Sequence, residues 1–292
     1  MYLPDIELHR SSTLAEAADL LDRYAPHARV LAGGTDLLVD LKTGRSQAAH
    51  LVSVNRIEAL HGISSTKTGL RIGALTTITQ LDESPALGEP FAPIRDATSQ
   101  MAARQIRNLA TVGGNLASAV PCADLPPILT AMHASVALWS TQGTREVPLE
   151  SFFVGVRQTA RRDDEILTAV LVPELPAGFG AAYARFALRA GNGIAVASVA
   201  AGLRIMPDGV IQEARVVLGA VAAVPKLVPD AASSLVGGPA SPDLFEQAGR
   251  ITMEAAEPIC DVRGSAEFRR ELVGVLTRRA LQTACDRAGE ST

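Results

Sequence analysis

The chain has 292 residues, of which 47% are hydrophobic and 20% charged, a composition typical of a soluble globular protein. Its formal net charge is −4, it has no basic tract, and only 4% of its residues are aromatic, so we expect no nucleic-acid partner. This length predicts two or three packed subdomains rather than one small core.

Cysteines and histidines give no sequence pattern of a metal site. Cys122, Cys260 and Cys285 form no CxxC pair, so a structural zinc, a disulfide framework or an iron–sulfur cluster within this chain is not favoured. The histidines lie apart in the sequence, without a ligand-like pair, and we interpret them as structural or surface residues: His9, His27, His50, His61 and His133. The sequence therefore predicts no metal site.

Targeting signals are also missing from the sequence. The N-terminal residues MYLPDIEL lack the charged and apolar regions of a signal peptide, and no apolar run reaches membrane length. We therefore expect a cytoplasmic protein without a membrane span.

The first fifty-five residues are predicted to form a β-α-β-α-β unit. Its expected elements are strand 5–8, helix 14–24, strand 29–32, helix 37–42 and strand 50–54. Ser12 or Thr13 with Glu16 predicts a capping box at the first helix. Thr35 is predicted to cap the second helix, which should end near Gly44.

Residues 56–175 are predicted to form a second subdomain of strands and helices. Its expected elements are strand 70–75, a helix capped by Thr76 that stops before Pro85, a mostly helical stretch 91–109, helix 124–132, and strands 135–139, 145–147 and 165–172. Near-helical spacing predicts a buried stripe of Ile94, Ala97, Met101, Ala102 and Ile106. Asp124 is placed to cap its helix, since Pro126 and Pro127 fall in the first turn.

Proline and glycine cluster in 173–180, which predicts a boundary before a third domain, 176–292. Its expected elements are strands 182–190, 195–205 and 214–221, a hairpin turn at Asp208-Gly209, and helices 242–257 and 265–288. The last helix should bury a face of Phe268, Leu272, Val275, Leu276 and Ala280. The predicted domains are therefore 1–55, 56–175 and 176–292.

Two glycine pairs, Gly33-Gly34 and Gly113-Gly114, share a local pattern: an apolar run, two glycines, then Thr or Asn and more apolar residues. Glycine permits positive φ and a close approach of backbone N–H groups to an anion. One pair alone is typical of a tight turn, but two suggest a diphosphate held from two sides. There is no P-loop, and Tyr183 and Val196 occupy the third small position of the Rossmann-like runs that begin at 178 and 191.

Four ordered segments carry a resemblance to a known family. They are AGGTDLL (32–38), TVGGNLASAVPCADLPP (111–127), DEILTAVLVP (164–173) and YARFALRAGNGIAVASVAAG (183–202). Together they resemble the FAD-binding medium subunit of the molybdenum hydroxylases, the family of xanthine dehydrogenase and aerobic carbon monoxide dehydrogenase. The resemblance implies an α+β protein. A two-subdomain FAD-binding fold, PCMH/vanillyl-alcohol-oxidase-like, would be followed by a C-terminal α+β domain with a three-stranded sheet and helices.

The resemblance also implies which residues bind FAD. Backbone donors of 32–36 would wrap the pyrophosphate, and the second turn would supply the other side of the cradle. Asp124 would bind sugar hydroxyls, Ile166 and Leu167 would line the isoalloxazine ring, and Arg185 would place a positive charge near the flavin. The implied cofactor-binding residues are Leu31, Ala32, Gly33, Gly34, Thr35, Asp36, Leu37, Thr111, Gly113, Gly114, Asn115, Ser118, Asp124, Ile166, Leu167 and Arg185.

Some of these residues have simpler alternatives. Asp124 could serve only as a helix cap, and Arg185 could be a charge at a strand edge. Cys122 is interpreted as a small buried apolar residue rather than a redox thiol. Asn192 replaces the acid of the family pattern R-x-G-D, so its role stays open.

The implied function is that of an electron-transfer flavoprotein subunit, an oxidoreductase without a catalytic acid, base or nucleophile of its own. Its partners would be a small subunit with two [2Fe-2S] clusters and a large subunit with molybdopterin cytosine dinucleotide, assembled as a dimer of heterotrimers. The hydroxybenzoyl-CoA reductase branch is disfavoured because its four-cysteine insertion is missing. Two alternatives are a free-standing FAD-dependent reductase of the same fold and a nucleotide-binding regulatory module.

Overall fold

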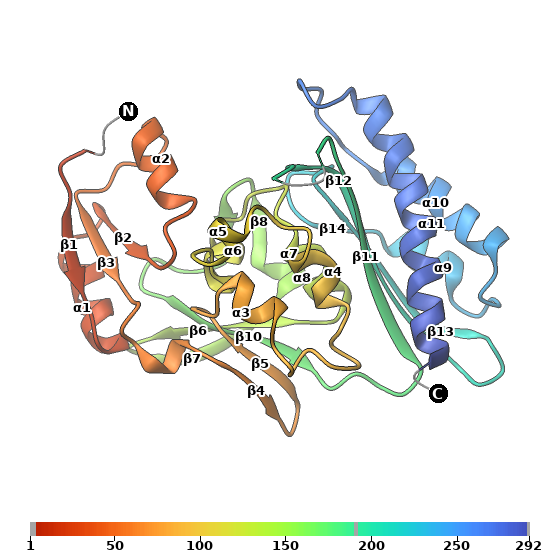
Figure 1. The fold of residues 1–292 in the computed structure, drawn as a ribbon, viewed down its shortest axis with the longest axis horizontal. Coiled ribbons are helices and arrows are strands. Elements are labelled where there is room, and N and C mark those ends of the chain that lie inside the picture. Colours follow the sequence, from red (N-terminus) through yellow and green to blue (C-terminus); the bar gives the residue numbers. More distant parts are fainter. Residues whose placement is uncertain (1–3, 190–191, 291–292) are drawn as a thin grey trace.

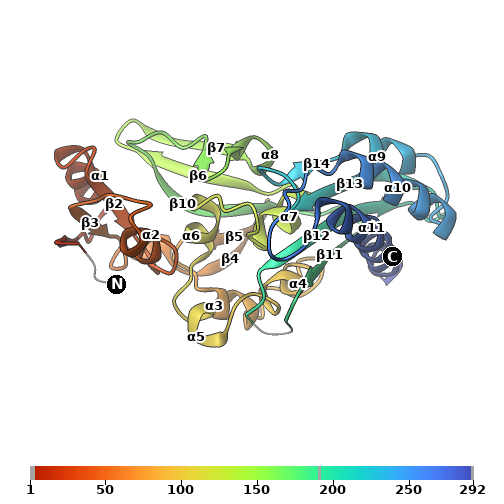
Figure 2. The ribbon, with the colours of Figure 1, turned by 90° about the horizontal axis from the view of Figure 1, so that it is seen from above.

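The computed structural model describes residues 4–189 and 192–290. Three sheets follow one another along the molecule, from the N-terminal sheet at one end to the C-terminal sheet at the other (Figure 1). The view from above shows the same order, with the middle sheet and its helices between the two ends (Figure 2). The structure confirms the α+β class and shows the expected C-terminal sheet, with its own helices, after the first two sheets.

The N-terminal sheet is parallel and has the strand order β1-β3-β2. Its elements are β1 (Glu7–Arg10), α1 (Leu14–Arg23), β2 (Ala28–Leu31), α2 (Leu37–Thr43) and β3 (His50–Ser53). Alternate side chains point to opposite faces. Val30 and Val52 pack with the apolar residues of α1, while Leu31 and Leu51 pack with those of α2. The predicted β-α-β-α-β order is therefore confirmed.

The ends of these helices differ in part from the sequence prediction. Thr13 caps α1, because its Oγ1 accepts from the N–H of Glu16 at 3.1 Å. Asp36, rather than the predicted Thr35, is the N-cap residue of α2, and its side chain makes no capping hydrogen bond. Gly44 ends α2 in the left-handed conformation, as predicted.

The middle sheet is antiparallel, with the strand order β4-β5-β10-β6-β7. Its strands are β4 (Ile63–Thr66), β5 (Gly69–Gly73), β6 (Ser135–Ser140), β7 (Gly143–Pro148) and β10 (Ile166–Pro173), with a small hairpin of β8 (Phe153–Gly155) and β9 (Gln158–Thr159). The helical segments are η1 (Glu58–Leu60), α3 (Ile78–Asp82), α4 (Ile94–Thr98), α5 (Arg104–Arg107), α6 (Val112–Ala117), α7 (Leu125–Ala131) and α8 (Leu149–Phe152).

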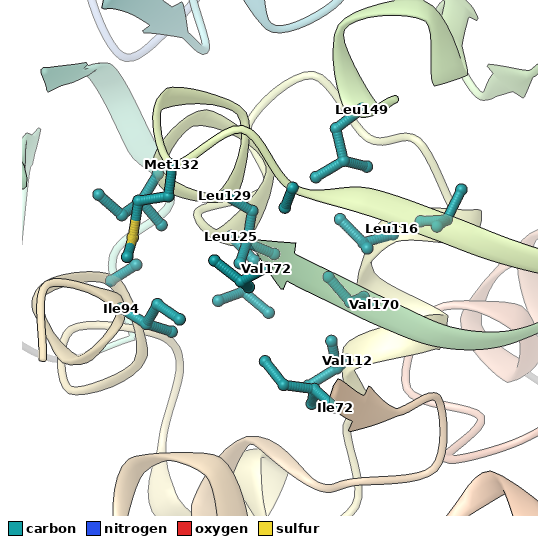
Figure 3. Close-up of a cluster of buried hydrophobic side chains, with 14 of the residues drawn as sticks. Ile72, Ile94, Val112, Leu116, Leu125, Leu129, Met132, Leu149, Val170 and Val172 are labelled. Atoms are coloured by element: carbon teal, nitrogen blue, oxygen red, sulfur yellow. The ribbon is translucent and has the colours of Figure 1, made fainter. Parts of the chain in front are cut away.

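The main core lies between this sheet and its helices. Ile72 and Val170 of the sheet face Val112 and Leu116 of α6 and Leu125 of α7 (Figure 3). Burial of these side chains fixes α6 and α7 against the sheet. The core thereby holds the second glycine pair, which lies at the start of α6, in a rigid position.

Three predictions for this region are wrong in detail. The cap of α3 is Thr77, one residue after the predicted Thr76, and forms a capping box with Gln80. The stretch 91–109, predicted to be mostly helical, contains only two short helices, with Ala102 between them at φ +35°. As a result the buried stripe ends at Met101, and Ile106 is 43% exposed.

The C-terminal sheet has the order β11-β12-β13-β14. Its elements are β11 (Phe179–Ala187), β12 (Ala195–Ile205), β13 (Ile211–Gly219), β14 (Lys226–Leu227), α9 (Pro229–Leu235), α10 (Pro242–Ala255) and α11 (Ala266–Glu290). The predicted three-stranded sheet thus gains β14 as a short fourth strand. The predicted turn at Asp208-Gly209 is confirmed, with Gly209 at φ +81°.

Both faces of the C-terminal sheet are covered. Helix α11 crosses one face, and α7 of the middle subdomain packs on β12 and β13 from the other (Figure 1). Because both faces are buried, the sequence of β12 is an almost continuous apolar run. The last helix buries Val273, Leu276 and Ala280, but the predicted Phe268 is 42% exposed.

Candidate functional site

The two glycine turns lie against each other. A Cβ atom built on Gly33 would be 1.9 Å from the carbonyl oxygen of Leu109, the residue two positions before Thr111. Only glycine permits this approach of the two backbones. The β2–α2 turn and the segment that leads into α6 are therefore in direct contact, although they belong to different sheets.

A cleft of about 370 Å³ opens between these two turns and the start of β10. Most of the candidate residues line it: Ala32, Gly33, Gly34, Thr35, Asp36, Leu37, Thr111, Gly113, Gly114, Asn115, Ser118, Ile166 and Leu167. A smaller cavity of about 260 Å³ contains Asp124 and shares Asp36, Asn115 and Ser118 with the larger cleft. The two spaces therefore meet at the glycine turns.

Two candidate residues line neither space. Leu31 packs in the core under α2, with Leu41 and Leu51. Arg185, on β11, lies behind the smaller cavity, where its guanidinium contacts Asp124. Leu31 thus supports the turn from below, and Arg185 acts on the cavity through Asp124.

The first glycine turn offers unused backbone donors. In the described part of the chain, the N–H groups of residues 33–37 donate no hydrogen bond. Gly34 has φ +75°, which folds the backbone back on itself. Successive amides that point to one side in this way form an anion-binding concavity.

The second glycine pair has a different geometry. It lies in the first turn of α6, where the N–H groups of Val112, Gly113 and Gly114 donate to Thr76 O, Ala74 O and Thr111 Oγ1. The amides that the sequence suggested as anion donors are therefore already paired. A Cβ on Gly113 would lie 2.7 Å from the Cβ of Ala74, so this glycine is needed for packing.

Side chains of α6 face the cleft instead. Asn115 lines both spaces, and its Oδ1 is buried without a hydrogen-bond partner in the described residues. A buried acceptor without a partner is rare in folded proteins. Ser118 and Thr111 add hydroxyl groups to the same wall. Backbone amides without partners among the described residues on one side, and polar side chains on the other, suit the pyrophosphate of a dinucleotide.

Asp124 is held by the C-terminal sheet. Its Oδ1 accepts from the Tyr183 hydroxyl at 2.7 Å and from Arg185 Nη1 at 2.9 Å, while Arg185 Nη2 donates to Gly193 O at 2.5 Å. Burial raises the pKa of the Asp124 carboxyl, which the Arg185 charge opposes. Burial also raises the pKa of Tyr183 well above its usual range. The Asp124 side chain makes no capping hydrogen bond, so its interpretation as a side-chain cap is wrong.

Charged residues that the sequence analysis missed complete the larger cleft. Arg29, Arg157 and Arg161 line it, together with Asp40 and Glu165. Arg157 Nη1 donates to Asp40 Oδ2 at 2.5 Å across 117 residues of sequence, a pairing that no local pattern indicates.

The acid at the start of β10 supports this wall. The Glu165 side chain is 1% exposed and accepts from Arg145 Nε at 2.5 Å, which lowers the pKa of Glu165 to about 2. It also accepts from the backbone N–H of Arg162 at 2.7 Å. Glu165 is therefore a structural anion that holds the 161–165 turn.

The thiol of Cys122 lines the smaller cavity. Burial, followed by the nearby Asp124 charge, raises its pKa. A raised pKa disfavours the reactive thiolate form of Cys122, but the residue is half-buried rather than buried as the sequence analysis expected.

Comparisons with known proteins agree with this geometry. Residues 4–175 match the family described as the FAD binding domain in molybdopterin dehydrogenase, and residues 181–284 match the carbon monoxide dehydrogenase flavoprotein C-terminal domain. The chain is 33% identical to the carbon monoxide dehydrogenase medium chain of Afipia carboxidovorans, over 97% of both chains. It is 32% identical to a putative xanthine dehydrogenase FAD-binding subunit of Escherichia coli K12, over 96% of both.

A solved structure is similar over the full length. Carbon monoxide dehydrogenase from Hydrogenophaga pseudoflava, in a form that lacks the Mo-pyranopterin moiety of the molybdenum cofactor, gives a TM-score of 0.94 at 30% identity. The match covers 98% of this chain and 99% of the other.

The fold and the cleft thus define an FAD-binding oxidoreductase subunit, and the chain belongs to the FAD-binding family of the molybdopterin dehydrogenases. Within that family it is a medium subunit of the carbon monoxide dehydrogenase and xanthine dehydrogenase type. Among the described residues, no helix has the length and apolar character needed to cross a membrane.

Proposed function

We propose that this chain carries electrons through FAD, from [2Fe-2S] clusters of a separate small subunit to an external acceptor such as NAD, a quinone, a carrier protein or oxygen. A large subunit with molybdopterin cytosine dinucleotide would oxidise the substrate. The full-length similarity to medium chains supports this division of labour. The chain's three cysteines are fewer than the four thiolates of an ordinary cluster.

The observation that carries the proposal is the pair of facing walls in the cleft. Among residues 4–189 and 192–290, the N–H groups of 33–37 on one wall and Asn115 Oδ1 on the other have no hydrogen-bond partner, and the Ser118 hydroxyl adds a polar group to the second wall. We place the FAD pyrophosphate at the amides of the first turn. The second turn contributes through the side chains of Thr111, Asn115 and Ser118 rather than through its amides. The flavin supplies the redox chemistry, and this chain binds, orients and tunes it.

The larger cleft and the smaller cavity suggest where the adenine and isoalloxazine rings of FAD lie. The larger cleft has an apolar wall of Val54, Ile166 and Leu167, which suits the uncharged adenine. The smaller cavity is lined by apolar side chains, among them Met101, Val120 and Ile194, and has the Asp124 carboxyl in its wall, which suits a flat ring with polar edges. We therefore propose the isoalloxazine ring for the smaller cavity, rather than beside Ile166 and Leu167, where the family resemblance alone would place it.

The domain boundaries and the assembly are parts of the same proposal. We propose units 1–55, 56–175 and 176–292, because each contains one of the three main sheets. We also propose a cytoplasmic dimer of heterotrimers, and the relatives' names as subunits and medium chains support the multi-subunit part of this proposal.

Purification of the chain, alone and with its partner subunits, tests the proposal. We expect an oxidised-flavin absorption spectrum, FAD released on denaturation, and a larger complex on co-expression. Turnover of a small substrate with NADPH by the isolated chain would favour a free-standing reductase. A colourless protein that binds ADP would favour a regulatory module.

Gly114→Val tests the assignment of the cleft directly. A Cβ on Gly114 would be 2.9 Å from Thr111 Oγ1, so a larger side chain disturbs this wall and should give protein without flavin. Gly88→Val is the control, because the nearest atom to its Cβ is 3.8 Å away. Equal flavin content in the two variants would contradict the assignment.

A further inference from the structure

A cluster of possible metal ligands lies on the N-terminal sheet, away from the FAD cleft. Glu7 and His9 are two residues apart on β1, and His50 is the register partner of Glu7 on the parallel strand β3. Side chains two apart on a strand share a face, so these three groups lie on the face that also carries Val52 and is covered by α1. None of them lines the FAD cleft or the smaller cavity.

The aromatic ring of Tyr24, at the end of α1, covers the cluster. It stacks on the His50 ring at a centroid distance of 3.9 Å and on the His9 ring at 4.7 Å. The side chains of His9 and His50 are 13% and 22% exposed, whereas Glu7 is 64% exposed. The two imidazoles are thus held in place by packing, and the carboxylate closes the open side.

The distances between the ligand atoms fit a single ion. His9 Nε2 and His50 Nδ1 are 3.1 Å apart, Glu7 Oε2 is 3.5 Å from His50 Nδ1, and Glu7 Oε1 is 3.9 Å from His9 Nε2. Ligands at roughly 2.0–2.2 Å from a tetrahedral Zn²⁺ ion lie about 3.3–3.6 Å from one another. The three observed separations are close to this range.

We propose that Glu7, His9 and His50 bind one divalent transition-metal ion of the Zn²⁺ class. Two imidazole nitrogens and one carboxylate oxygen are ligands that suit Zn²⁺, and three protein ligands leave a fourth position for water. Without metal, the two imidazoles share one N–H···N hydrogen bond. The ion replaces that bond and adds the carboxylate.

Metal binding would act on stability rather than on electron transfer. Strand β1 has four residues and lies at the edge of its sheet. An ion shared by β1 and β3 ties this edge strand to the centre of the sheet and binds only the folded form. Added metal should therefore raise the unfolding temperature, whether or not FAD is bound.

The test uses the full-length chain without an affinity tag, treated with a chelator and then titrated with ZnCl₂. Calorimetry should show one Zn²⁺ bound per chain, and thermal unfolding should shift upward with Zn²⁺ concentration. His50→Gln and His9→Gln should weaken binding by at least about tenfold, since even the loss of an outer-shell partner has that effect. His27→Ala is the matched control, because His27 is an exposed histidine of the same subdomain outside the cluster.

Glu7→Gln is a second test in case the histidine variants misfold, because this exposed side chain can be changed without disturbing the packed rings. It should keep the flavin content of the parent protein and bind Zn²⁺ more weakly. Absence of saturable one-to-one binding would overturn the proposal. So would equal Zn²⁺ affinity in the parent, His9→Gln and His50→Gln proteins. Flavin content measured on the same samples separates this outcome from a failure of the FAD assignment.

Discussion

The Arg185 guanidinium and the Asp124 carboxylate form an ion pair at 2.9 Å across 61 residues of sequence. Their side chains are only 5% and 11% exposed. The pair joins β11 of the C-terminal sheet to the start of α7 in the middle subdomain. Asp124 therefore neutralises the Arg185 charge within the protein. The smaller cavity lies next to a neutral ion pair rather than next to an unpaired positive charge.

Removal of Arg185 should destabilise the protein strongly. Arg185→Gln leaves a buried carboxylate without its cationic partner, which costs about 3–5 kcal/mol in the free energy of unfolding. Denaturant unfolding of the apoprotein measures this loss. Arg104→Gln removes an exposed pair with Glu83 and should cost less than about 1 kcal/mol. Equal losses in the two variants would show that the buried pair has no special role.

Gly33→Ala should separate the two glycine turns. The new Cβ cannot lie 1.9 Å from the Leu109 carbonyl oxygen, so one backbone must move and the cleft must widen. We expect protein with strongly reduced flavin content, measured from the absorbance ratio of the flavin and protein bands. Gly88→Ala, which adds a methyl group at an ordinary contact distance of 3.8 Å from its nearest neighbour, should keep its flavin. A Gly33→Ala protein with the same flavin content as the parent would contradict the observed contact.

Asn115→Leu should separate cofactor binding from stability. The Asn115 Oδ1 atom has no partner in the described residues, so its removal costs the apoprotein little and can stabilise it by about 1 kcal/mol. FAD affinity, measured by fluorescence titration, should fall because a polar contact is lost. Asn108→Leu is the control, since Asn108 is exposed and lines neither space. Loss of stability together with unchanged FAD affinity would refute the role of Asn115.

Stability at low pH should depend on Glu165. Its folded pKa is about 2, below the usual 4.5, so its contribution is fully present above pH 4.5. That contribution is lost as the pH falls through the window from 4.5 to 2. Glu165→Gln should be less stable near neutral pH, by about 1.5–3 kcal/mol for a charged hydrogen bond, and should lose less on acidification. Unfolding free energies measured from pH 6 to pH 2 compare it with the parent protein, and an equal loss on acidification in the two proteins would contradict the role of Glu165.

The sequence by itself determined the family, the α+β class and many of the elements. The segments around Gly33-Gly34 and Gly113-Gly114 are short sequence motifs. Such motifs can be recognised without knowing how the rest of the chain folds. Strand 195–205 is predicted to the residue, because burial on both faces leaves a continuous apolar run. By contrast, β4 has the polar sequence ISST, which carries no strand alternation. Helix α6 has two glycines in its first turn, and glycine disfavours a helix in any prediction from sequence.

Only the tertiary structure decided which groups are free and which are paired. In the folded chain Arg157 pairs with Asp40, and His9 contacts His50 across 41 residues. The Asp124 side chain binds Tyr183 and Arg185 instead of capping its helix. The physical reason is that dihedral preference and burial are properties of short segments. Hydrogen-bond and ligand partners depend on strand register and on packing between sheets, which no short segment contains.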